Sequence, residues 1–253
     1  MRRHRLPSVI DRLASDCETV RTVRGRAPSL DADRAVVEEL SDAVATTGVP
    51  AVRVWTPHRQ VAFGRRDARA EGYERARQRA DANGYPAIER SVGGRAVAYT
   101  GTTVAFAAVV PTATPRQETT ARYEAATTGV VRALRSLGVP ARRGEPDASF
   151  CPGEHSVQAR GKIAGLAQRI QRETARVSGI VVVDGHEELA TVLDEVYDAL
   201  GVPFAPESVG SVARGGGPAD SEAVVDALFD AFCGDLSTES VSVEDVLADD
   251  PTR

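Results

Sequence analysis

Arg160-Gly161-Lys162-Ile163-Ala164-Gly165-Leu166-Ala167-Gln168-Arg169 is the stretch of this 253-residue chain that decides its fold. Residues 156–159 and 162–168 flank the Arg-Gly pair, which predicts a β-hairpin that turns at the glycine. Lys162 is the single lysine among 31 lysine and arginine residues. A chain that otherwise uses arginine keeps a lysine where a compact point charge is required. We therefore interpret Lys162 as a functional ammonium that polarises an acyl carbonyl or binds a phosphate oxygen, with a solvated surface lysine as the simpler alternative.

A second stretch, Arg90-Ser91-Val92-Gly93-Gly94-Arg95-Ala96-Val97, joins an extended segment to the apolar run 104–110. Glycines at such a junction permit positive φ or close approach of the backbone to a ligand. The two flanking arginines supply charge for a carboxylate or phosphate. The stretch is a candidate ligand loop, and an ordinary tight turn is the alternative.

Cys151 is the candidate nucleophile. It stands in Ser149-Phe150-Cys151-Pro152-Gly153, directly before the predicted hairpin. A small buried apolar residue is the usual role of a lone cysteine, but a Pro-Gly loop is an unusual place for one. His155 follows closely and is a candidate base.

Composition excludes several classes of protein. A length of 253 residues fits one domain of ordinary size, and the hydrophobic fraction of 42% is enough for a core. The net charge of −5 argues against a dedicated nucleic-acid binder, and no apolar run reaches the length of a membrane helix, so we expect a soluble, cytoplasmic protein. The three cysteines lie far apart and lack neighbours at metal-ligand spacing, so neither a disulfide framework nor a metal site is expected.

Hydrophobic periodicity predicts an α/β fold with a mixed central sheet and flanking helices packed mainly on one side. The chain is expected to form helices at 31–45, 67–83, 122–137, 187–200 and 221–233. Strands are expected at 51–55, 60–63, 87–90, 104–110, 156–159, 162–168 and 177–183.

Taken together, these stretches resemble the lipoate-protein ligase and octanoyltransferase family, which shares its catalytic fold with biotin-protein ligases. The resemblance covers about residues 52–183. The family's Arg-Arg-x-Ser/Thr-Gly-Gly-Gly/Arg-Ala-Val-x-His-Asp appears at 89–100, where the second arginine, two glycines and Ala-Val match, while Glu89, Val92, Tyr99 and Thr100 depart. The family's Gly-x-x-Asp appears at 144–147, and its Gly-Arg/Lys-Lys-Ile-x-Gly-x-Ala-Gln appears at 160–168 as the more specific match.

The resemblance implies a biotin/lipoate-protein-ligase-like catalytic domain at 1–205, preceded by an N-terminal helix, and a C-terminal helical extension with an acidic tail at 206–253. It implies a contact of Lys162 with the acyl carbonyl. Ser-Tyr/Phe-Cys-Pro-Gly marks the branch that moves octanoyl or lipoyl groups through a cysteine thioester, which makes Cys151 and Lys162 the catalytic residues. The implied substrate-binding residues are Arg90, Gly93, Gly94, Arg95, Ala96, Tyr99, Asp147, Gly161, Ala164, Gly165 and Gln168.

The expected activity is protein lipoylation: transfer of an octanoyl or lipoyl group to a lysine of a lipoyl carrier domain. The resemblance names the partners as 2-oxoacid dehydrogenase E2 or glycine-cleavage H protein, with acyl carrier protein as a further donor and with no nucleic acid or membrane. The thioester route requires no cofactor. Two alternatives stay open: an ATP- and Mg-dependent lipoate-protein ligase that forms an acyl-adenylate, and a non-catalytic relative that binds lipoyl or biotinyl carriers.

Overall fold

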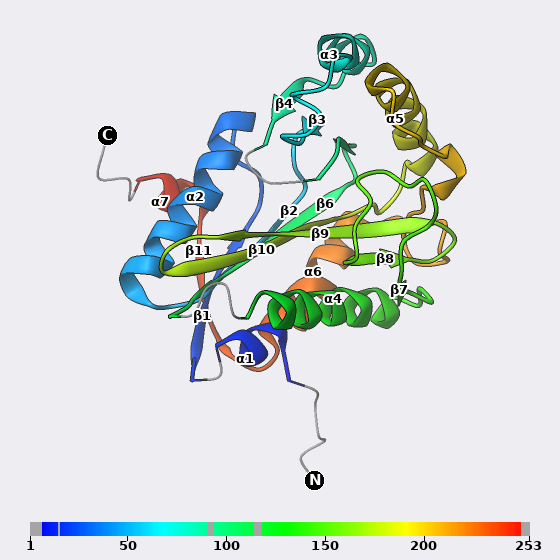
Figure 1. The fold of residues 1–253 in the computed structure, drawn as a ribbon. Helices are drawn as coiled ribbons and strands as arrows, with labels where there is room; N and C mark the ends of the chain where they lie inside the picture. Colours follow the sequence, from blue (N-terminus) through cyan, green and yellow to red (C-terminus); the bar gives the residue numbers. More distant parts are fainter. Residues whose placement is uncertain (1–6, 15, 91–93, 114–117, 249–253) are drawn as a thin grey trace.

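An eight-stranded mixed sheet runs through the protein (Figure 1). The computed structural model describes residues 7–14, 16–90, 94–113 and 118–248. The strand order is β11 (Ser237–Val241), β1 (Thr19–Arg24), β2 (Ala51–Trp55), β6 (Val104–Pro111), β10 (Thr174–Val181), β9 (Lys162–Ile170), β8 (Ser156–Gln158) and β7 (Arg142–Arg143). β1 is parallel to both β2 and β11, and the remaining neighbours are antiparallel. The predicted mixed sheet is confirmed.

β2 and β3 (Gln60–Phe63) have the predicted bounds, whereas the short strands β5 (Val97–Tyr99) and β7 were not predicted. β8 and β9 form the expected antiparallel hairpin, closed by Arg160 and Gly161, which both adopt positive φ. β6 is buried along nearly its whole length, as its unbroken apolar sequence indicates. β1 was not predicted, because Thr-Val-Arg-Thr-Val-Arg alternates polar and apolar residues only weakly.

Helices cover both faces of the large sheet (Figure 1). On one face lie α1 (Val9–Leu13), α4 (Thr119–Ser136) and α6 (Ser221–Cys233), and the ring of Phe232 on α6 lies 5.1 Å from that of Phe106 on β6. On the other face lie α2 (Leu30–Thr47) and α7 (Val243–Ala248), where Leu40 packs in a core with Val109. The expectation that helices pack mainly on one side is therefore wrong. The reason is that β6 carries apolar side chains at every position, so both of its faces need a cover.

A three-stranded sheet of order β4-β3-β5 forms a second layer at the top of Figure 1. It contains β3 (Gln60–Phe63), β4 (Ala87–Glu89) and β5 (Val97–Tyr99), and it packs with α3 (Tyr73–Ala82) and α5 (His186–Leu200) around one apolar cluster. The helix predicted at 67–83 begins only at Tyr73. The preceding residues form turns instead, because the side chain of Asp67 binds the backbone N–H of Gly64 at 3.2 Å.

The segment that follows α5 packs with the rest of the fold. After the short 3₁₀ helix η1 (Pro206–Ser208), α6 places Val224, Leu228 and Phe232 in the same core as β6 and α4. β11 then pairs with β1 at the edge of the large sheet, which adds a strand to a region expected to be helical. The division at residue 205 stays a prediction. Among the described residues, no helix is long and apolar enough to cross a membrane.

Candidate active site

Cys151 lies in the loop between β7 and β8, and a tyrosine of α5 holds its backbone. The N–H of Cys151 donates to the hydroxyl of Tyr197 at 2.6 Å, and this hydroxyl donates to the carbonyl of Ala96 at 3.0 Å. Burial raises the pKa of Tyr197, so the hydroxyl keeps its proton and can serve both neighbours. Cys151 adopts φ +41°, a conformation that residues other than glycine rarely take and that requires support from the surroundings.

The sulfur of Cys151 accepts two N–H groups. Nη2 of Arg90 and the backbone N–H of Arg95 each lie 3.3 Å from Sγ. The thiol is partly exposed, so a substrate can reach it. One donor that carries a positive charge and one backbone donor therefore face an accessible sulfur. The structure thus brings together the two arginines and the cysteine that the sequence singled out.

Gly94 makes this approach possible. It adopts φ +93°, and a Cβ at this position would lie 2.7 Å from the Cys151 sulfur and 2.9 Å from Nη2 of Arg90. The carbonyl of Gly94 in turn lies only 2.0 Å from where a Cβ of Gly64 would stand. Glycine is therefore required at 94 both for conformation and for space. Gly93, the other glycine of the stretch, lies outside the described residues.

Arg90 stays charged in spite of its partly buried position. Its Nη2 also donates to the carbonyl of Arg95 at 2.6 Å. Burial lowers the pKa of Arg90, but the nearby Cys151 and Tyr99 raise it by more, and the net direction is upward. Burial raises the pKa of Tyr99, so its phenol stays neutral beside the guanidinium. The permanent cation of Arg90 therefore faces the sulfur.

Asp67 positions Arg95 and was not singled out from the sequence. Its carboxylate is fully buried, accepts Nη1 of Arg95 at 3.1 Å, and accepts the backbone N–H of Gly64 at 3.2 Å. This ion pair fixes the side chain of Arg95, while the backbone N–H of the same residue faces Sγ of Cys151. The Gly-Arg-Arg-Asp run directly after a buried strand was the available signal, but nothing in it indicates a partner 28 residues away.

Lys162 is fully buried at the start of β9, and all of its donors are engaged. Nζ lies 3.0 Å from each carboxylate oxygen of Glu145 and 2.9 Å from the carbonyl oxygens of both Phe150 and Cys151. Burial lowers the pKa of Lys162, and the adjacent Glu145 carboxylate raises it in part. The ammonium therefore holds the backbone at Phe150 and Cys151, which differs from the direct acyl contact implied by the family resemblance.

Glu145 ties the two ends of the cysteine loop together. Besides Lys162, its carboxylate accepts the N–H of Gly153 at 3.1 Å and the hydroxyls of Ser149 and Ser156. These partners lie on both sides of Cys151 along the chain. The sequence pointed instead to Asp147 in the same Gly-x-x-Asp run, but Asp147 is exposed. Glu145 was missed because two carboxylates stand close together there, and only the folded loop shows which one turns inward.

Two further predicted residues face away from the cysteine. The side chain of Gln168 accepts Nε of Arg122 on α4 at 2.9 Å, and Ala164 packs in the core beneath α4. Gly165 lies on the opposite face of β9 from both residues. A Cβ added at Gly165 would lie 3.3 Å from Cε of Lys162. The reason is the alternation of a strand, in which residues 164 and 168 point to one side and residue 165 to the other. Of these three residues of β9, Gly165 is therefore the one that faces the side chain of Lys162.

Gly161 and Ala96 serve the site through their backbones. Gly161 adopts φ +111°, and a Cβ there would lie 2.7 Å from the backbone nitrogen of Gly210. The N–H of Gly210 donates to the carbonyl of Lys162 at 2.9 Å, so this close approach anchors the first residue of β9. Ala96 is buried and offers the carbonyl that Tyr197 binds.

The remaining candidates lie elsewhere. The imidazole of His155 stacks on the ring of Tyr123 with centroids 3.8 Å apart, and among the described contacts none joins it to Cys151. Arg169 and Arg176 both bind Glu38. Within the described parts of the chain, no cluster of three or more His, Cys, Asp or Glu residues has the arrangement of a metal site.

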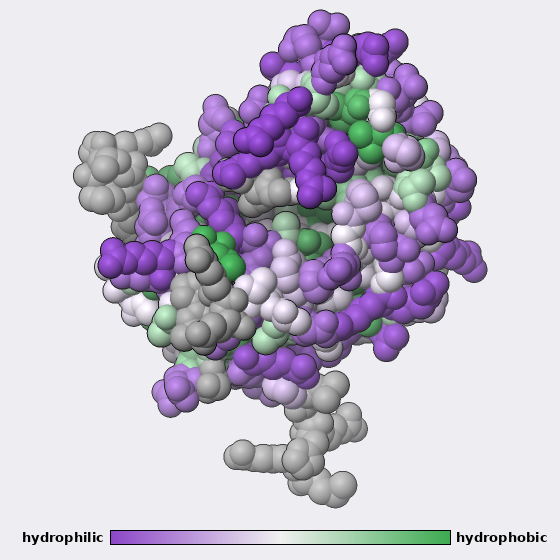
Figure 2. Space-filling view, viewed as in Figure 1, coloured by the Kyte–Doolittle hydropathy of each residue, from purple (hydrophilic) through white to green (hydrophobic). Residues whose placement is uncertain are grey.

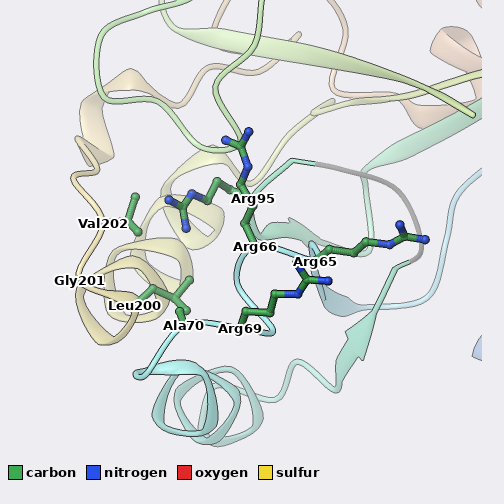
Figure 3. Close-up of a pocket in the computed structure, with 8 residues that line it drawn as sticks. All are labelled: Arg65, Arg66, Arg69, Ala70, Arg95, Leu200, Gly201 and Val202. Carbon is green, nitrogen blue, oxygen red and sulfur yellow. The ribbon is translucent and has the colours of Figure 1, made fainter.

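A hollow of about 530 Å³ adjoins the site (Figure 3). Four arginines line it, and the turn after α5 forms an apolar wall opposite them with Leu200 and Val202. The arginines are Arg65, Arg66, Arg69 and Arg95. Figure 2 shows a second feature. In the middle of the face that this figure presents there is a recess, with hydrophobic residues at its floor and hydrophilic residues above it. The hollow at Arg95 therefore offers cationic side chains beside an apolar wall.

Comparison with known sequences agrees with this arrangement. Residues 27–233 match the family model of the lipoyl protein ligase A/B catalytic domain. The chain is 31% identical to octanoyltransferase LipM of Kyrpidia tusciae, in a match covering 60% of this chain and 63% of that protein. It is 26% identical to octanoyl-[GcvH]:protein N-octanoyltransferase of Oceanobacillus iheyensis, covering 60% and 55%. The chain thus spans between 55% and 63% of the length of these curated relatives.

Solved structures with this fold cover nearly the whole chain. A lipoate-protein ligase A bound with ATP superposes with a TM-score of 0.69 at 19% identity, covering 92% of this chain and 93% of that one. A bi-partite lipoate protein ligase from Thermoplasma acidophilum superposes with a TM-score of 0.66 at 19% identity, covering 91% of each. At this level of identity the likeness establishes the fold, and it confirms the architecture expected from the sequence.

Proposed function

The chain belongs to the lipoyl protein ligase A/B catalytic-domain family, and on that basis we propose that it transfers an octanoyl or lipoyl group to a lysine of a lipoyl carrier domain through a thioester on Cys151. The observation that carries this proposal is the surroundings of the sulfur. A partly exposed Sγ lies between the Arg90 guanidinium and the Arg95 N–H, on a loop that Tyr197 and Lys162 hold in place. A merely structural cysteine needs none of these contacts.

In the first step, the Cys151 thiolate attacks the acyl carbonyl of the donor. The bond between the carbonyl carbon and the donor's sulfur or nitrogen breaks, the leaving atom takes a proton from solvent, and the acyl group stays on Sγ as a thioester. The N–H of Arg95 and the guanidinium of Arg90 lie beside the atom that attacks. They are therefore the proposed donors to the oxygen on which negative charge develops.

In the second step, the neutral amine of the acceptor lysine attacks the thioester carbonyl. An amide bond forms, the Cys151 sulfur leaves as a thiolate, and the amine loses its extra proton to solvent. The departing thiolate again lies between its two donors, which stabilise it. Neither step consumes a nucleotide, because the donor already carries an activated or exchangeable acyl bond.

Lys162 acts as a positioning residue in this scheme. Its ammonium has three N–H bonds to give and four acceptors within 3.0 Å, so no donor is left for an acyl oxygen in this arrangement. By binding the carbonyls of Phe150 and Cys151, it fixes the direction in which the cysteine side chain leaves the loop. Glu145 supplies the opposite charge that makes a buried ammonium tolerable.

The acyl chain is proposed to lie along the face of the large sheet that bears Gly165. Register places Gly165 opposite Ile180, and Ile180 opposite Ala105, so small and apolar residues form a row there. A row of this kind accepts a linear hydrocarbon without a polar group to desolvate. Gly94, Arg95 and Tyr99 stay the proposed contacts at the carboxyl end of that chain.

The proposed donor and acceptor are lipoyl carrier proteins. The relative from Oceanobacillus iheyensis is named for octanoyl-[GcvH] as its donor, and the relative from Kyrpidia tusciae is named as an octanoyltransferase. Glycine-cleavage H protein is therefore the first donor to try, with a lipoyl domain of a 2-oxoacid dehydrogenase E2 as the acceptor. Acyl carrier protein is the second donor.

The test is transfer between two purified carriers. Octanoylated H protein is incubated with an unmodified E2 lipoyl domain and the enzyme without nucleotide, and the intact mass of the acceptor is followed. A gain of one octanoyl group on the acceptor, lost in Cys151→Ala, supports the proposal. Modification that requires lipoate and ATP and releases pyrophosphate would establish a ligase instead. Binding of the carrier without modification under any of these conditions would establish a non-catalytic binder.

A further inference from the structure

The arginine-lined hollow of Figure 3 gathers three arginines that have no acidic partner among the described residues, beside a fourth, Arg95, that is bound to Asp67. Arg65, Arg66 and Arg69 are exposed, and none of them forms an ion pair with an acid in the described part of the chain. Some arginines elsewhere in the fold are paired, such as Arg59 with Glu188 and Arg143 with Glu124. The chain carries 36 acidic residues against 31 basic ones, so a lack of acids does not explain the cluster.

Clustered unpaired cations repel one another and raise the local electrostatic potential. Asp67 is the acid nearest to them in sequence, but it is fully buried and already bound to Arg95. Its charge therefore compensates Arg95 and leaves the three exposed arginines unbalanced. Such a field attracts an anionic partner and increases its rate of encounter.

The hollow is continuous with the active site through Arg95. The side chain of Arg95 lines the hollow, and its backbone N–H contacts the Cys151 sulfur at 3.3 Å. An acyl group that reaches Cys151 on the arm of a carrier protein brings the body of that carrier to the rim of the site. The apolar wall formed by Leu200 and Val202 offers contact area beside the charges.

We propose that Arg65, Arg66 and Arg69, with the wall at Leu200 and Val202, form a docking surface for an acidic face of the carrier protein that delivers or accepts the acyl group. This inference rests on the proposed function. A folded acidic face fits the observations better than a small anion does, because three of the four arginines are exposed instead of converging on a closed cavity. The arginines thus serve recognition of the carrier and not the chemistry on the acyl group.

The experiment compares a carrier-borne donor with a small one. Acyl-enzyme formation is measured with octanoylated H protein and with octanoyl-N-acetylcysteamine, a thioester that has no protein body. The test variant is Arg65→Glu/Arg66→Glu/Arg69→Glu. The matched control, Arg12→Glu/Arg26→Glu/Arg172→Glu, makes the same change of charge at exposed arginines that do not line the hollow.

With the carrier-borne donor at low salt, the test variant is expected to lose about tenfold or more in kcat/KM relative to the control variant. Its loss with the small thioester is expected to be several-fold smaller. For the wild type, kcat/KM with the carrier is expected to fall as salt rises to about 0.5 M, because mobile ions screen exposed charges over that range. This salt dependence is independent of any variant and tests the surface even if the triple substitution impairs folding.

Equal losses with both donors would overturn the inference, since the arginines would then act on the acyl group itself. A test variant that matches its control with the carrier, together with a salt-insensitive wild type, would overturn it as well. Failure of the proposed function has a different signature. In that case the wild type forms no acyl-enzyme with either donor.

Discussion

Replacement of Glu145 by glutamine is the sharpest probe of how the nucleophile is held. The side chain keeps its size and one acceptor oxygen, but it loses the negative charge and turns an NH₂ group toward donors. The Lys162 ammonium, 1% exposed at its side chain, then faces no counter-charge. The N–H of Gly153 and the hydroxyls of Ser149 and Ser156 lose a charged acceptor at the same time.

Breaking a fully buried ion pair by removing one partner costs about 3 to 5 kcal/mol. Because the side chain of Glu145 is 24% exposed, solvent replaces part of the lost interaction, and we expect about 2 to 3 kcal/mol in the free energy of unfolding. That corresponds to a change of about 30- to 140-fold in the unfolding equilibrium constant. Thioester formation should slow as well, because the peptide of Cys151 is held through Lys162.

The same substitution should change how stability depends on pH. The pKa of Lys162 is lowered in the native state by burial, from an ordinary value of 10.5. The unfolded chain therefore keeps this proton to higher pH than the native chain, and the free energy of unfolding rises with pH across that interval. Loss of Glu145 lowers the native pKa further. The variant should thus regain more stability than the wild type as the pH rises toward 10.5.

The assay is urea unfolding followed by the fluorescence of Trp55, the single tryptophan, at several pH values. Glu154→Gln is the matched control, because Glu154 is an exposed carboxylate in the same loop. Its free energy of unfolding should stay within about 0.5 kcal/mol of the wild type. If Glu145→Gln behaves like this control in stability and in thioester formation, the carboxylate does not hold the loop and the reasoning is wrong.

Three further predictions follow from single contacts. Gly94→Ala should reduce acyl-enzyme formation by about tenfold or more, because the added methyl would lie 2.7 Å from the Cys151 sulfur. Mass spectrometry of the acyl-enzyme checks this, with Gly84→Ala as the control, because Gly84 also has positive φ but has open space around it. Tyr197→Phe should lower the free energy of unfolding by about 1 to 3 kcal/mol, measured in urea, since the N–H of Cys151 loses its acceptor. Cys233 should resist iodoacetamide at about pH 8 while Cys151 reacts, because burial raises the pKa of Cys233 to about 12; peptide mapping that finds Cys233 alkylated first would contradict the fold around it.

Local motifs were enough to single out residues that the structure gathers around Cys151. Short runs of sequence made it possible to predict Cys151, Lys162, Arg90, Gly94 and Arg95. Each run combines residue types that are unusual in an ordinary surface or core segment. The hairpin of β8 and β9 followed from the turn at Arg160-Gly161 in the same way. The structure brings these residues to one place, as the order of the motifs implied.

Partners distant in sequence could not be predicted in this way. Tyr197 and Asp67 contact the site only because α5 and the turn after β3 pack beside it, and nothing in their own surroundings marks them. Gln168 shows the converse, since its face depends on which side of β9 the helix α4 covers. β11 was missed because its pairing with β1, more than 200 residues earlier, is what makes Ser-Thr-Glu-Ser-Val a strand.

The choice between Glu145 and Asp147 illustrates the same limit at short range. The two carboxylates are separated by one residue, and the motif favoured the second. Only the path of the loop decides that Glu145 turns inward to Lys162 while Asp147 remains exposed. A buried lysine requires a counter-charge, but the burial of Lys162 was itself not predicted from the sequence.

The most direct test of the account is the intact mass of the enzyme after brief incubation with octanoylated H protein and no nucleotide. The account predicts an adduct of one octanoyl group that hydroxylamine removes, that is present in Glu154→Gln and that is absent in Cys151→Ala. An adduct that persists in Cys151→Ala would show that another residue carries the acyl group. Transfer to an acceptor lysine by Cys151→Ala at the wild-type rate would contradict the central claim outright.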